Sequence, residues 1–345
     1  MKIIVDAMGG DLAPKEIVLG ALDAAANSGV DVILVGKGET ILEVLNAHNI
    51  HTLPKGVEIA NADDVVDMHD DPTTVLKKRP DSSMIVGLRM LADGAGDAFV
   101  SAGSTGALLT AATLTAKRIK GIRRAAMGPV VPTSEGKCII MDCGANAECT
   151  SEFLLQFAYM GSFYAQQMMG VDRPRVALLN IGTEDTKGGA LQKETYALLQ
   201  EASKSGELNF IGNIEGRDVP LGGADVVVTD GFTGNVLLKS IEGTALFMGK
   251  LISSMFKKNA LTKFCALLCA GGIRRIKKTM DYREVGGTAF IGLKKPVIKA
   301  HGSSDRRAIE CAIGQAALAV EHELCGVIED NIAKMTPTRE EQHAE

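Results

Sequence analysis

The side chains best suited to chemistry lie in glycine-rich turns that follow short apolar runs. In "FVSAGSTGALLTA", Gly103 and Gly106 flank two hydroxyl side chains, Ser104 and Thr105. The apolar residues before this turn predict the end of a buried strand, and Leu108 onward predicts a helix. Such a strand–turn–helix presents free backbone N–H groups and the positive end of a helix dipole at one point. We therefore predict that this turn binds an anion, with a geometry suited to phosphate.

Three further turns carry groups that would assist such a site. They are "NIGTEDTKGG" at residues 180–189, "TDGFTGN" at 229–235 and "KAHGSSD" at 299–305. The first contains Lys187 and the last contains His301. One glycine-rich turn is a weak signal, because most such turns only close a loop. Several at one edge of a sheet, with Lys and His among them, favour a shared anion site.

The elements that would position these turns alternate along the chain. Short apolar runs end in a glycine or polar turn, and a helical pattern then follows. Helices are predicted at residues 14–27, 40–48, 152–169, 190–204 and 236–248. Continuous apolar strands separated by helices indicate a largely parallel sheet covered on both faces, and hence a three-layer αβα fold. Ligands of such sheets gather beyond the carboxyl ends of the strands, where each of the turns would lie.

The domain organisation is predicted to be simple. No linker divides the chain, so we expect one large α/β domain over residues 1–330, built as one unit or as two lobes. A polar tail at residues 336–345 is expected to be frayed. The N-terminal apolar run is three residues long and is followed by Asp6, so no secretory signal is expected.

Composition limits the class of protein. Hydrophobic residues make up 46% of the chain and aromatic residues only 4%, which predicts an aliphatic core. The formal net charge of −5 argues against general nucleic-acid binding. Seven cysteines without a C-x-x-C pair are interpreted as reduced thiols of a cytosolic protein, and no metal site is expected.

Two common cofactor motifs and one catalytic motif are missing. The chain has no P-loop and no G-x-S-x-G nucleophile turn. Gly36 and Gly38 match the start of a dinucleotide fingerprint, but Ile41 stands where its third glycine is needed. No base is evident near Cys143 or Cys149, so buried core thiols are the better interpretation. No cofactor is expected.

Residues 246–280 reverse the overall charge. They contain eight Lys and Arg, and no acidic residue occurs between Glu242 and Asp281. Apolar side chains recur at helical spacing within the same stretch. This combination predicts a surface for an anionic membrane or an acidic protein, and the alternative is an ordinary amphipathic helix pair with solvated lysines. The predicted surface residues are Leu251, Met255, Phe256, Lys257, Lys258, Phe264, Arg274 and Arg275.

Several blocks of the sequence resemble one family. They are "DAMGGD", "SAGSTGA", "LLNIGTE", "GNIEGRD", "DVVVTDGFTGNVLLKSIEG" and "HGSSD", which occur in that order between Lys2 and Ile328. They resemble blocks of the bacterial phosphate acyltransferases of phospholipid synthesis, the acyl-carrier-protein:phosphate transacylases. Ser104 stands where that family more often has Asn. Several ordered blocks are far more specific than any single one.

The resemblance implies a reaction, a fold and partners. Inorganic phosphate would attack the thioester of a long-chain acyl carrier protein, giving acyl phosphate and the free carrier thiol. The implied fold is like that of isopropylmalate dehydrogenase and phosphotransacetylase. The resemblance also implies a homodimer in the cytoplasm, attached peripherally to the inner face of the membrane, directly or through a partner acyltransferase. Residues 246–280 would then attract the acidic carrier protein and release the amphiphilic product.

Within this reaction the candidate residues take distinct roles. Lys187 and Asn235 are predicted to stabilise the developing oxyanion. His301 would orient phosphate or protonate the leaving thiolate, and Asp230 would hold a loop or orient a cation. Asn146, in "CGAN", is a candidate for the phosphate pocket. For Asp230 and Asn146 a purely structural role in a turn is an equal alternative.

Three other functions compete with this one. A coenzyme A-dependent short-chain phosphate transacylase would use acetyl-CoA and need no carrier protein. A decarboxylating dehydrogenase on a similar scaffold would need nicotinamide and a divalent metal. A non-catalytic lipid-sensing scaffold on the membrane surface would use residues 246–280 but would leave the glycine turns without a purpose.

Overall fold

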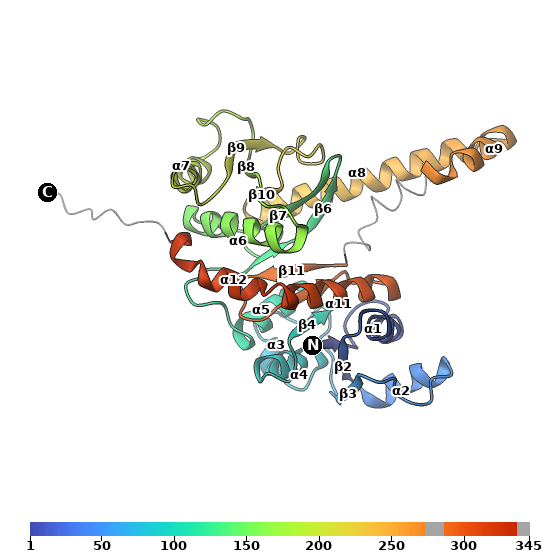
Figure 1. The fold of residues 1–345 in the computed structure, drawn as a ribbon. Helices are drawn as coiled ribbons and strands as arrows, with labels where there is room; N and C mark the ends of the chain where they lie inside the picture. Colours follow the sequence, from blue (N-terminus) through green and yellow to red (C-terminus); the bar gives the residue numbers. More distant parts are fainter. Residues whose placement is uncertain (273–285, 337–345) are drawn as a thin grey trace.

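The computed structural model describes residues 1–272 and 286–336, which form two β-sheets (Figure 1). The larger sheet has seven strands in the order β3–β2–β1–β4–β12–β11–β5. Its strands are β1 (Lys2–Asp6), β2 (Asp31–Gly36), β3 (Val57–Asn61), β4 (Ala98–Ser101), β5 (Ala126–Gly128), β11 (Gly287–Ile291) and β12 (Val297–Ala300). β3, β2, β1, β4 and β12 run parallel, and β11 is antiparallel to both of its neighbours.

The second sheet has five strands in the order β6–β7–β10–β8–β9. They are β6 (Val130–Thr133), β7 (Gly136–Met141), β8 (Val176–Asn180), β9 (Phe210–Glu215) and β10 (Val226–Val228). All are parallel except β6, which forms an antiparallel hairpin with β7. The predicted α/β class with largely parallel strands is confirmed, but the chain builds two sheets where the sequence pattern suggested one.

Helices cover both faces of the larger sheet. α1 (Lys15–Ser28) and α11 (Arg306–Glu321) pack on one face, and α4 (Ser83–Ala92) and α5 (Thr105–Thr115) pack on the other. α2 (Gly38–Ala47) and the short α3 (Val75–Lys78) complete this part of the molecule. The layers form because the central strands β1, β4 and β12 are buried on both faces, so neither face can be left in water.

The smaller sheet is covered in the same way. α6 (Ser151–Met169) packs against β7 and β10, and α7 (Ala190–Lys204) packs beside α6. The opposite face is covered by the first turns of α8 (Gly231–Lys257), through Leu238. α12 (Leu324–Asp330) and the 3-10 helix Ile332–Met335 lie against α6. α8 then extends away from the rest of the molecule and carries α9 (Ala260–Leu268) near its tip (Figure 1).

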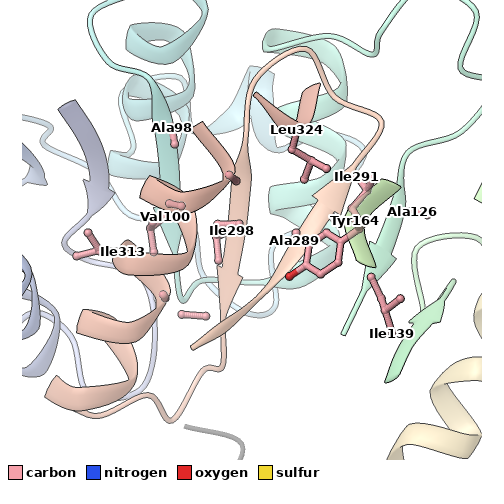
Figure 2. Packing of buried hydrophobic residues seen from close by; sticks show 14 of the residues in the cluster. Ala98, Val100, Ala126, Ile139, Tyr164, Ala289, Ile291, Ile298, Ile313 and Leu324 are labelled. Atoms are coloured by element: carbon pink, nitrogen blue, oxygen red, sulfur yellow. The ribbon is translucent and has the colours of Figure 1, made fainter. Parts of the chain in front are cut away.

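One apolar core joins the two sheets. In Figure 2, Val100 and Ile298 of the larger sheet lie near Ile313 of α11, while Ile139 of β7 belongs to the same cluster. Tyr164 of α6 lies beside β11, and its hydroxyl accepts a hydrogen bond from Gln315 of α11 at 2.9 Å. The single α/β domain over residues 1–330 stays a prediction, but the shared core joins the two sheets in one packed body.

Two predicted helices begin earlier than the sequence pattern indicated. α5 starts at Thr105 rather than Leu108, and α8 starts at Gly231 rather than Val236 and continues to Lys257. Asp230 explains the second start, because its carboxylate accepts a hydrogen bond from the Thr233 backbone N–H at 2.9 Å. The other predicted helices agree with the observed ones within one or two residues at each end.

Within the described ranges no single helix is long and apolar enough to cross a membrane, and only the bent pair of α11 and α12, taken together, reaches that length and composition.

Candidate active site

A layer of polar side chains ends three neighbouring strands of the larger sheet. The register pairs Lys299 of β12 with Ser101 of β4, and β1 places Asp6 on the same rung. The rung before it on this face is apolar, formed by Ile4, Phe99 and Val297. Because side chains alternate between the faces of a strand, Asp6, Ser101 and Lys299 all face the layer of α4 and α5. Each of the three is at most 8% exposed.

Hydrogen bonds connect this polar layer to the predicted phosphate turn. The Ser101 hydroxyl donates to Asp6 Oδ2 at 2.7 Å and accepts from the Gly103 backbone N–H at 3.0 Å. Burial raises the pKa of Asp6, while hydrogen bonds from Ser83, Ser101 and nearby backbone N–H groups act in the opposite direction. The backbone around Gly9 is equally close, since a Cβ added there would lie 2.8 Å from Gly103 N. The Gly103 turn is therefore fixed by hydrogen bonds to the buried polar layer.

The turn itself presents the first turn of α5. Ser104 is the N-cap residue, its side chain makes no capping hydrogen bond, and it is 9% exposed. Thr105 and Gly106 belong to the helix, so their backbone N–H groups are among those without a partner inside the helix. Gly103 and Gly106 have no positive φ, and their small size serves close contacts with Met84 and Pro72 instead.

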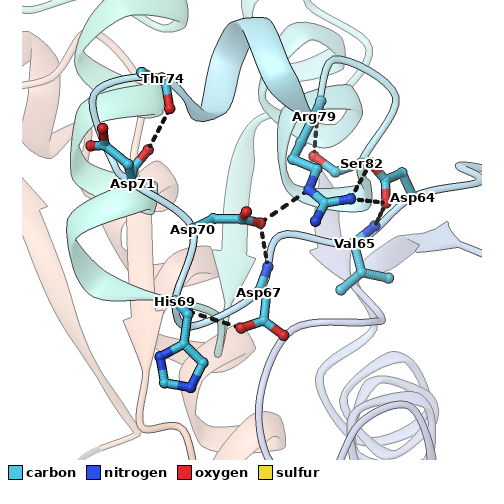
Figure 3. Close-up of polar contacts among 9 residues, drawn as sticks. All are labelled: Asp64, Val65, Asp67, His69, Asp70, Asp71, Thr74, Arg79 and Ser82. Atoms are coloured by element: carbon cyan, nitrogen blue, oxygen red, sulfur yellow. Dashed lines mark hydrogen bonds and ion pairs between the residues drawn. The ribbon is translucent and has the colours of Figure 1, made fainter.

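The segment before α4 covers this turn. Figure 3 shows Arg79 between two carboxylates, with Nε donating to Asp70 at 3.1 Å and NH1 donating to Asp64 at 3.2 Å. The Asp67 backbone N–H and Arg79 hold the pKa of Asp70 below its usual value. These bonds fix the loop that carries Pro72, whose ring would lie 3.0 Å from a Cβ at Gly106.

Lys299 is the buried cation of this region. Its Nζ donates to the Ala102 carbonyl at 3.3 Å and to the Ala300 carbonyl. Burial lowers its pKa to about 8, against the charges of Asp6 and Asp11, which raise it. Lys299 belongs to the predicted turn at residues 299–305, but no role was predicted for it.

His301 follows at the end of β12. Its Nδ1 accepts a hydrogen bond from the Ser303 backbone N–H at 3.2 Å, so the neutral ring carries its proton on Nε2. Burial lowers the pKa of His301, and the charges of Lys299 and Lys239 lower it further, while Glu242 opposes them. A neutral imidazole with an Nε2–H can donate a hydrogen bond to a phosphate oxygen. It is a poor acid for a thiolate, which favours the first of the two roles predicted for His301.

The smaller sheet presents a second set of candidates at its own carboxyl edge. Asp142 directly follows β7 and is fully buried. Its Oδ1 accepts from the N–H groups of Met127 and Cys143, both at 2.7 Å, and its Oδ2 accepts from Asn146 N at 2.6 Å. Asn146 Nδ2 donates to Asp142 Oδ2 at 3.1 Å and to the Ala125 carbonyl at 2.9 Å. Both side-chain hydrogens of Asn146 are thus used to build the loop, and its role in phosphate binding stays a prediction.

α8 begins against this loop. The Gly231 N–H donates to the Asn146 carbonyl at 2.7 Å, and a Cβ at Gly234 would lie only 2.0 Å from the Asp142 carbonyl oxygen. Asn235 comes next and lies close to Gly144, since a Cβ there would be 3.8 Å from Asn235 Cγ. Asp230 caps the helix and also accepts from the Thr233 hydroxyl at 2.7 Å, which is the loop-holding alternative for this residue.

Lys187 lies further along the same edge, in the loop after β8. Its Nζ is 3.8 Å from Glu184, and its side chain is 46% exposed. The Asn180 side chain donates to the Lys187 carbonyl at 3.2 Å, and Asn213 donates to the Glu184 carbonyl at 2.7 Å, so the loop is tied to β8 and β9. Its predicted role in stabilising an oxyanion stays a prediction.

The first part of α8 brings the two edges together. Lys239 lies one helical turn beyond Asn235, on the same side of α8, and forms an ion pair with Glu242 at 2.8 Å. The charges of this pair act both on His301 of the larger sheet and on Cys143 at the end of β7. The Lys239–Glu242 pair therefore lies between the two carboxyl edges. That Asn235, His301 and the turn at Gly103 face one common region stays a prediction.

Lys299, Asp6 and Lys239 are the residues of this region that sequence reasoning missed. A polar residue at or next to the end of an otherwise apolar strand, Asp6 in "KIIVD" and Lys299 in "VIKA", is the signal that would have found the first two. For Lys239 the spacing of four residues from Asn235 on a helix was available, but that helix was expected to start later.

The thiols near this region are not prepared for nucleophilic attack. Burial raises the pKa of Cys149 to about 12, and burial also raises that of Cys143, which is fully buried. Thiolates are the reactive form of cysteine, so both side chains are unreactive near neutral pH. Across the described residues no group of His, Cys, Asp and Glu side chains is arranged to hold a metal ion.

α8 and α9 expose an unusual amount of apolar surface. The predicted residues Leu251, Met255 and Phe264 are 46%, 56% and 58% exposed. Lys257 and Lys258 are exposed beside them, Phe256 is half-buried, and Leu267 and Leu268 are more than 70% exposed. Arg274 and Arg275 lie outside the described residues.

Comparison with known proteins gives one consistent result. The model of the family described as "Fatty acid synthesis protein" matches residues 1–327. The phosphate acyltransferase of Desulfitobacterium hafniense is 46% identical over 341 residues, which cover 99% of this chain and all of that protein. That of Thermoanaerobacter pseudethanolicus is 45% identical over 336 residues, 97% of this chain and 98% of that protein. Among solved structures, the EutD phosphotransacetylase from Staphylococcus aureus shares the fold, with a TM-score of 0.60 and 17% identity over 92% of this chain and 93% of its own.

Proposed function

The chain belongs to the fatty acid synthesis protein family of phosphate acyltransferases, and we propose that it transfers a long-chain acyl group from acyl carrier protein to inorganic phosphate. The acyl phosphate product would serve membrane phospholipid synthesis. One observation carries this proposal beyond the family name. The Gly103–Gly106 turn adjoins a buried layer that holds Lys299, and His301, which directly follows the same strand, is affected by the charges of Lys239 and Glu242 on α8.

The reaction requires two anionic partners to meet at one carbonyl group. A phosphate oxygen attacks the thioester carbonyl carbon, an O–C bond forms, and the C–S bond then breaks. The electron pair of that bond leaves on sulfur, and the carrier thiolate takes a proton from solvent. Since a thiol has a reference pKa of about 8.5, the thiolate departs without a strong acid. The protein therefore has to orient phosphate and stabilise the oxyanion.

The described residues divide these tasks. Gly103, Ser104, Thr105 and Gly106 are proposed to bind phosphate, with the His301 Nε2–H as a further donor. On the α8 side, Asn235 is proposed to donate to the oxyanion, and the charge of Lys187 would help to hold the anions at the same edge. Asp230 and Asn146 act by shaping the loop and the start of α8 that position Asn235.

An assay with defined substrates tests this function. Purified protein is incubated with long-chain acyl carrier protein and phosphate, and acyl phosphate is trapped with hydroxylamine as the hydroxamate. We expect product that saturates with phosphate and is missing when acetyl-CoA replaces the carrier protein. Turnover with acetyl-CoA alone would support the short-chain transacylase instead. A lack of phosphate-dependent thioester loss with any acyl donor would leave the lipid-sensing scaffold.

Variants connect the assay to the site. Asn235→Ala should lower kcat/KM by about 100-fold, the usual effect of removing one oxyanion donor. Gln200→Ala, at an exposed position of α7, should leave kcat/KM unchanged. Equal kcat/KM values for the two variants would remove Asn235 from the mechanism.

The exposed surface of α8 and α9 is proposed to bring the enzyme to its substrates. Apolar side chains flanked by Lys257 and Lys258 fit a peripheral contact with the inner, anionic face of the cytoplasmic membrane, and the same lysines would attract the acidic carrier protein. A homodimer and a contact with a membrane acyltransferase are further parts of this proposal. Sedimentation equilibrium tests the homodimer, which would be excluded by a monomer mass at micromolar concentration.

A further inference from the structure

The polar layer next to the proposed phosphate turn contains a buried cation, Lys299, for which no role was predicted from the sequence. Lys299 is 8% exposed on a strand whose other residues are all buried, and the same rung holds Ser101 and Asp6. Burying an ammonium group is costly unless it is paired. Its two hydrogen-bond partners are the uncharged carbonyls of Ala102 and Ala300, and no described carboxylate forms an ion pair with it.

The carboxylate on this rung is already engaged. Asp6 Oδ2 accepts from the Ser101 hydroxyl at 2.7 Å, and its Oδ1 accepts from the Met8 N–H at 3.2 Å. An ammonium group has three donors, and the two carbonyls account for two of them. The third is left for a ligand. Because Ala102 directly precedes Gly103, the Lys299 ammonium lies within one peptide of the turn where α5 begins.

We propose that Lys299 binds the phosphate substrate, its ammonium group donating to a phosphate oxygen held at the start of α5. The proposal rests on the proposed function, in which phosphate occupies this turn. It also explains why a lysine lies within the buried strand β12. A dianion next to the ammonium group would add a direct ionic partner, since Asp6 and Asp11 act on Lys299 only through their charge and form no ion pair with it.

Binding would then be linked to a proton. Burial lowers the pKa of Lys299 to about 8, so its charged form is lost as the pH rises through that value. A bound dianion favours the charged form, and phosphate binding above pH 8 therefore takes up a proton. Asp6 and Asp11 raise this pKa, and His301 is the other titratable group whose charge interacts with Lys299. The His301 pKa is lowered, so His301 is neutral in this range and does not mask the effect.

Calorimetric titration of the full chain with inorganic phosphate tests the proposal without an acyl donor. The wild type is compared at about pH 8.5 in two buffers of different ionisation enthalpy, which measures proton uptake directly. Lys299→Met and Lys299→Arg are then titrated beside it. Lys294→Met is the matched control, because Lys294 is an exposed residue just before the opposite end of β12.

We expect proton uptake in the wild type, a phosphate Kd at least ten-fold higher in Lys299→Met, and partial recovery of affinity in Lys299→Arg. Lys294→Met should keep the wild-type Kd. Wild-type binding without proton uptake overturns the proton linkage, and that measurement needs no variant to fold. A phosphate Kd unchanged in a folded Lys299→Met protein also overturns it. If Lys299 only supported the fold, the variant would melt at a lower temperature with the same Kd.

The two proposals fail in different experiments. If the wild type binds phosphate with proton uptake but forms no acyl phosphate, the proposed function is wrong and the Lys299 site remains. If it forms acyl phosphate while Lys299→Met keeps the wild-type Kd and KM for phosphate, the Lys299 site is wrong and the function remains.

Discussion

Asp142 organises the loop that positions α8, and replacing it with Asn should damage both stability and activity. Oδ1 of Asp142 accepts from the N–H groups of Met127 and Cys143 at 2.7 Å and of Ala145 at 3.4 Å, and Oδ2 accepts twice from Asn146, at 2.6 and 3.1 Å. In Asn one oxygen becomes an NH₂ group. In either orientation, at least two N–H donors then face another donor and lose their acceptor.

The expected cost follows from these contacts. Hydrogen bonds to a charged acceptor contribute roughly 1.5–3 kcal/mol each. We take the lower figure, because burial raises the pKa of Asp142 and Asn removes the buried charge. Two lost bonds then destabilise Asp142→Asn by about 3 kcal/mol, which lowers the melting temperature of a chain of this length by about 4 °C. Since the Asn146 carbonyl accepts from Gly231 at 2.7 Å, the start of α8 should shift, and kcat/KM should fall by about 100-fold.

Asp225→Asn is the control for this prediction. Asp225 directly precedes β10, at the opposite edge of the same sheet, and accepts three hydrogen bonds from Arg175 at 2.8–3.1 Å. It should lose stability but keep kcat/KM within about two-fold, because its contacts are remote from α8. Thermal unfolding and the hydroxamate assay measure both effects. Wild-type stability in Asp142→Asn, or equal loss of activity in the two variants, would refute the reasoning.

Three further changes test other parts of the structure. Gly234→Ala should displace the first turn of α8 and lower kcat/KM by at least ten-fold, because its Cβ would lie 2.0 Å from the Asp142 carbonyl oxygen. Gly243 lies on the same helix, and a Cβ added there would meet no atom within 4 Å, so Gly243→Ala should raise the free energy of unfolding by about 0.5–1 kcal/mol. A loss of activity in Gly243→Ala but not in Gly234→Ala would contradict the packing. The double variant Lys257→Glu, Lys258→Glu should bind anionic liposomes more weakly than the wild type in a flotation assay, while keeping its fold by circular dichroism. The control variant Lys193→Glu, Lys204→Glu on α7 should bind as the wild type does, and equal binding by both variants would contradict the proposed surface. A thiol reagent at about pH 8 should label the exposed Cys265 and Cys269 before Cys149, because burial raises the pKa of Cys149 to about 12. Labelling of Cys149 first, as located by mass spectrometry of peptides, would disprove this.

Apolar runs revealed most of the parallel strands, because a strand buried on both faces leaves a continuous signal. β1, β2, β4, β7, β8 and β10 were all predicted in this way. The division into two sheets was not predictable, since the same alternation of strands and helices fits one sheet or two. The step between the sheets is a single residue, Pro129, between β5 and β6, and nothing in its sequence marks a change of partner. β9 was missed because it is an edge strand that is mostly half-exposed.

The start of α8 was misjudged for a definite physical reason. The glycines of "GFTGN" suggested a turn, but Gly231 and Gly234 are needed where the helix touches the Asp142 loop. At both positions glycine is needed because a side chain would collide with the Asp142 loop, and not because the backbone requires an unusual conformation. Asp230 as the N-cap residue was the signal that would have placed the helix start correctly.

The turns of the candidate site could be predicted from the sequence, but the buried polar layer beneath the first turn could not. Ser104, Asn235 and His301 follow strands or begin helices, so their positions at the sheet edges follow from the sequence. The layer formed by Asp6, Ser101 and Lys299 depends on strand order and register, because β12 reaches β4 from almost 200 residues away. Spacing along the chain holds no trace of that pairing.

A crystal structure of the protein with inorganic phosphate tests the central claim most directly. We predict an anion at the turn that starts α5, contacting Ser104 and the N–H groups of Thr105 and Gly106, with Lys299 Nζ and His301 Nε2 within hydrogen-bond distance. Asn235 should face it from α8. Phosphate bound only elsewhere, with this turn filled by side chains or closed to solvent, would contradict the account.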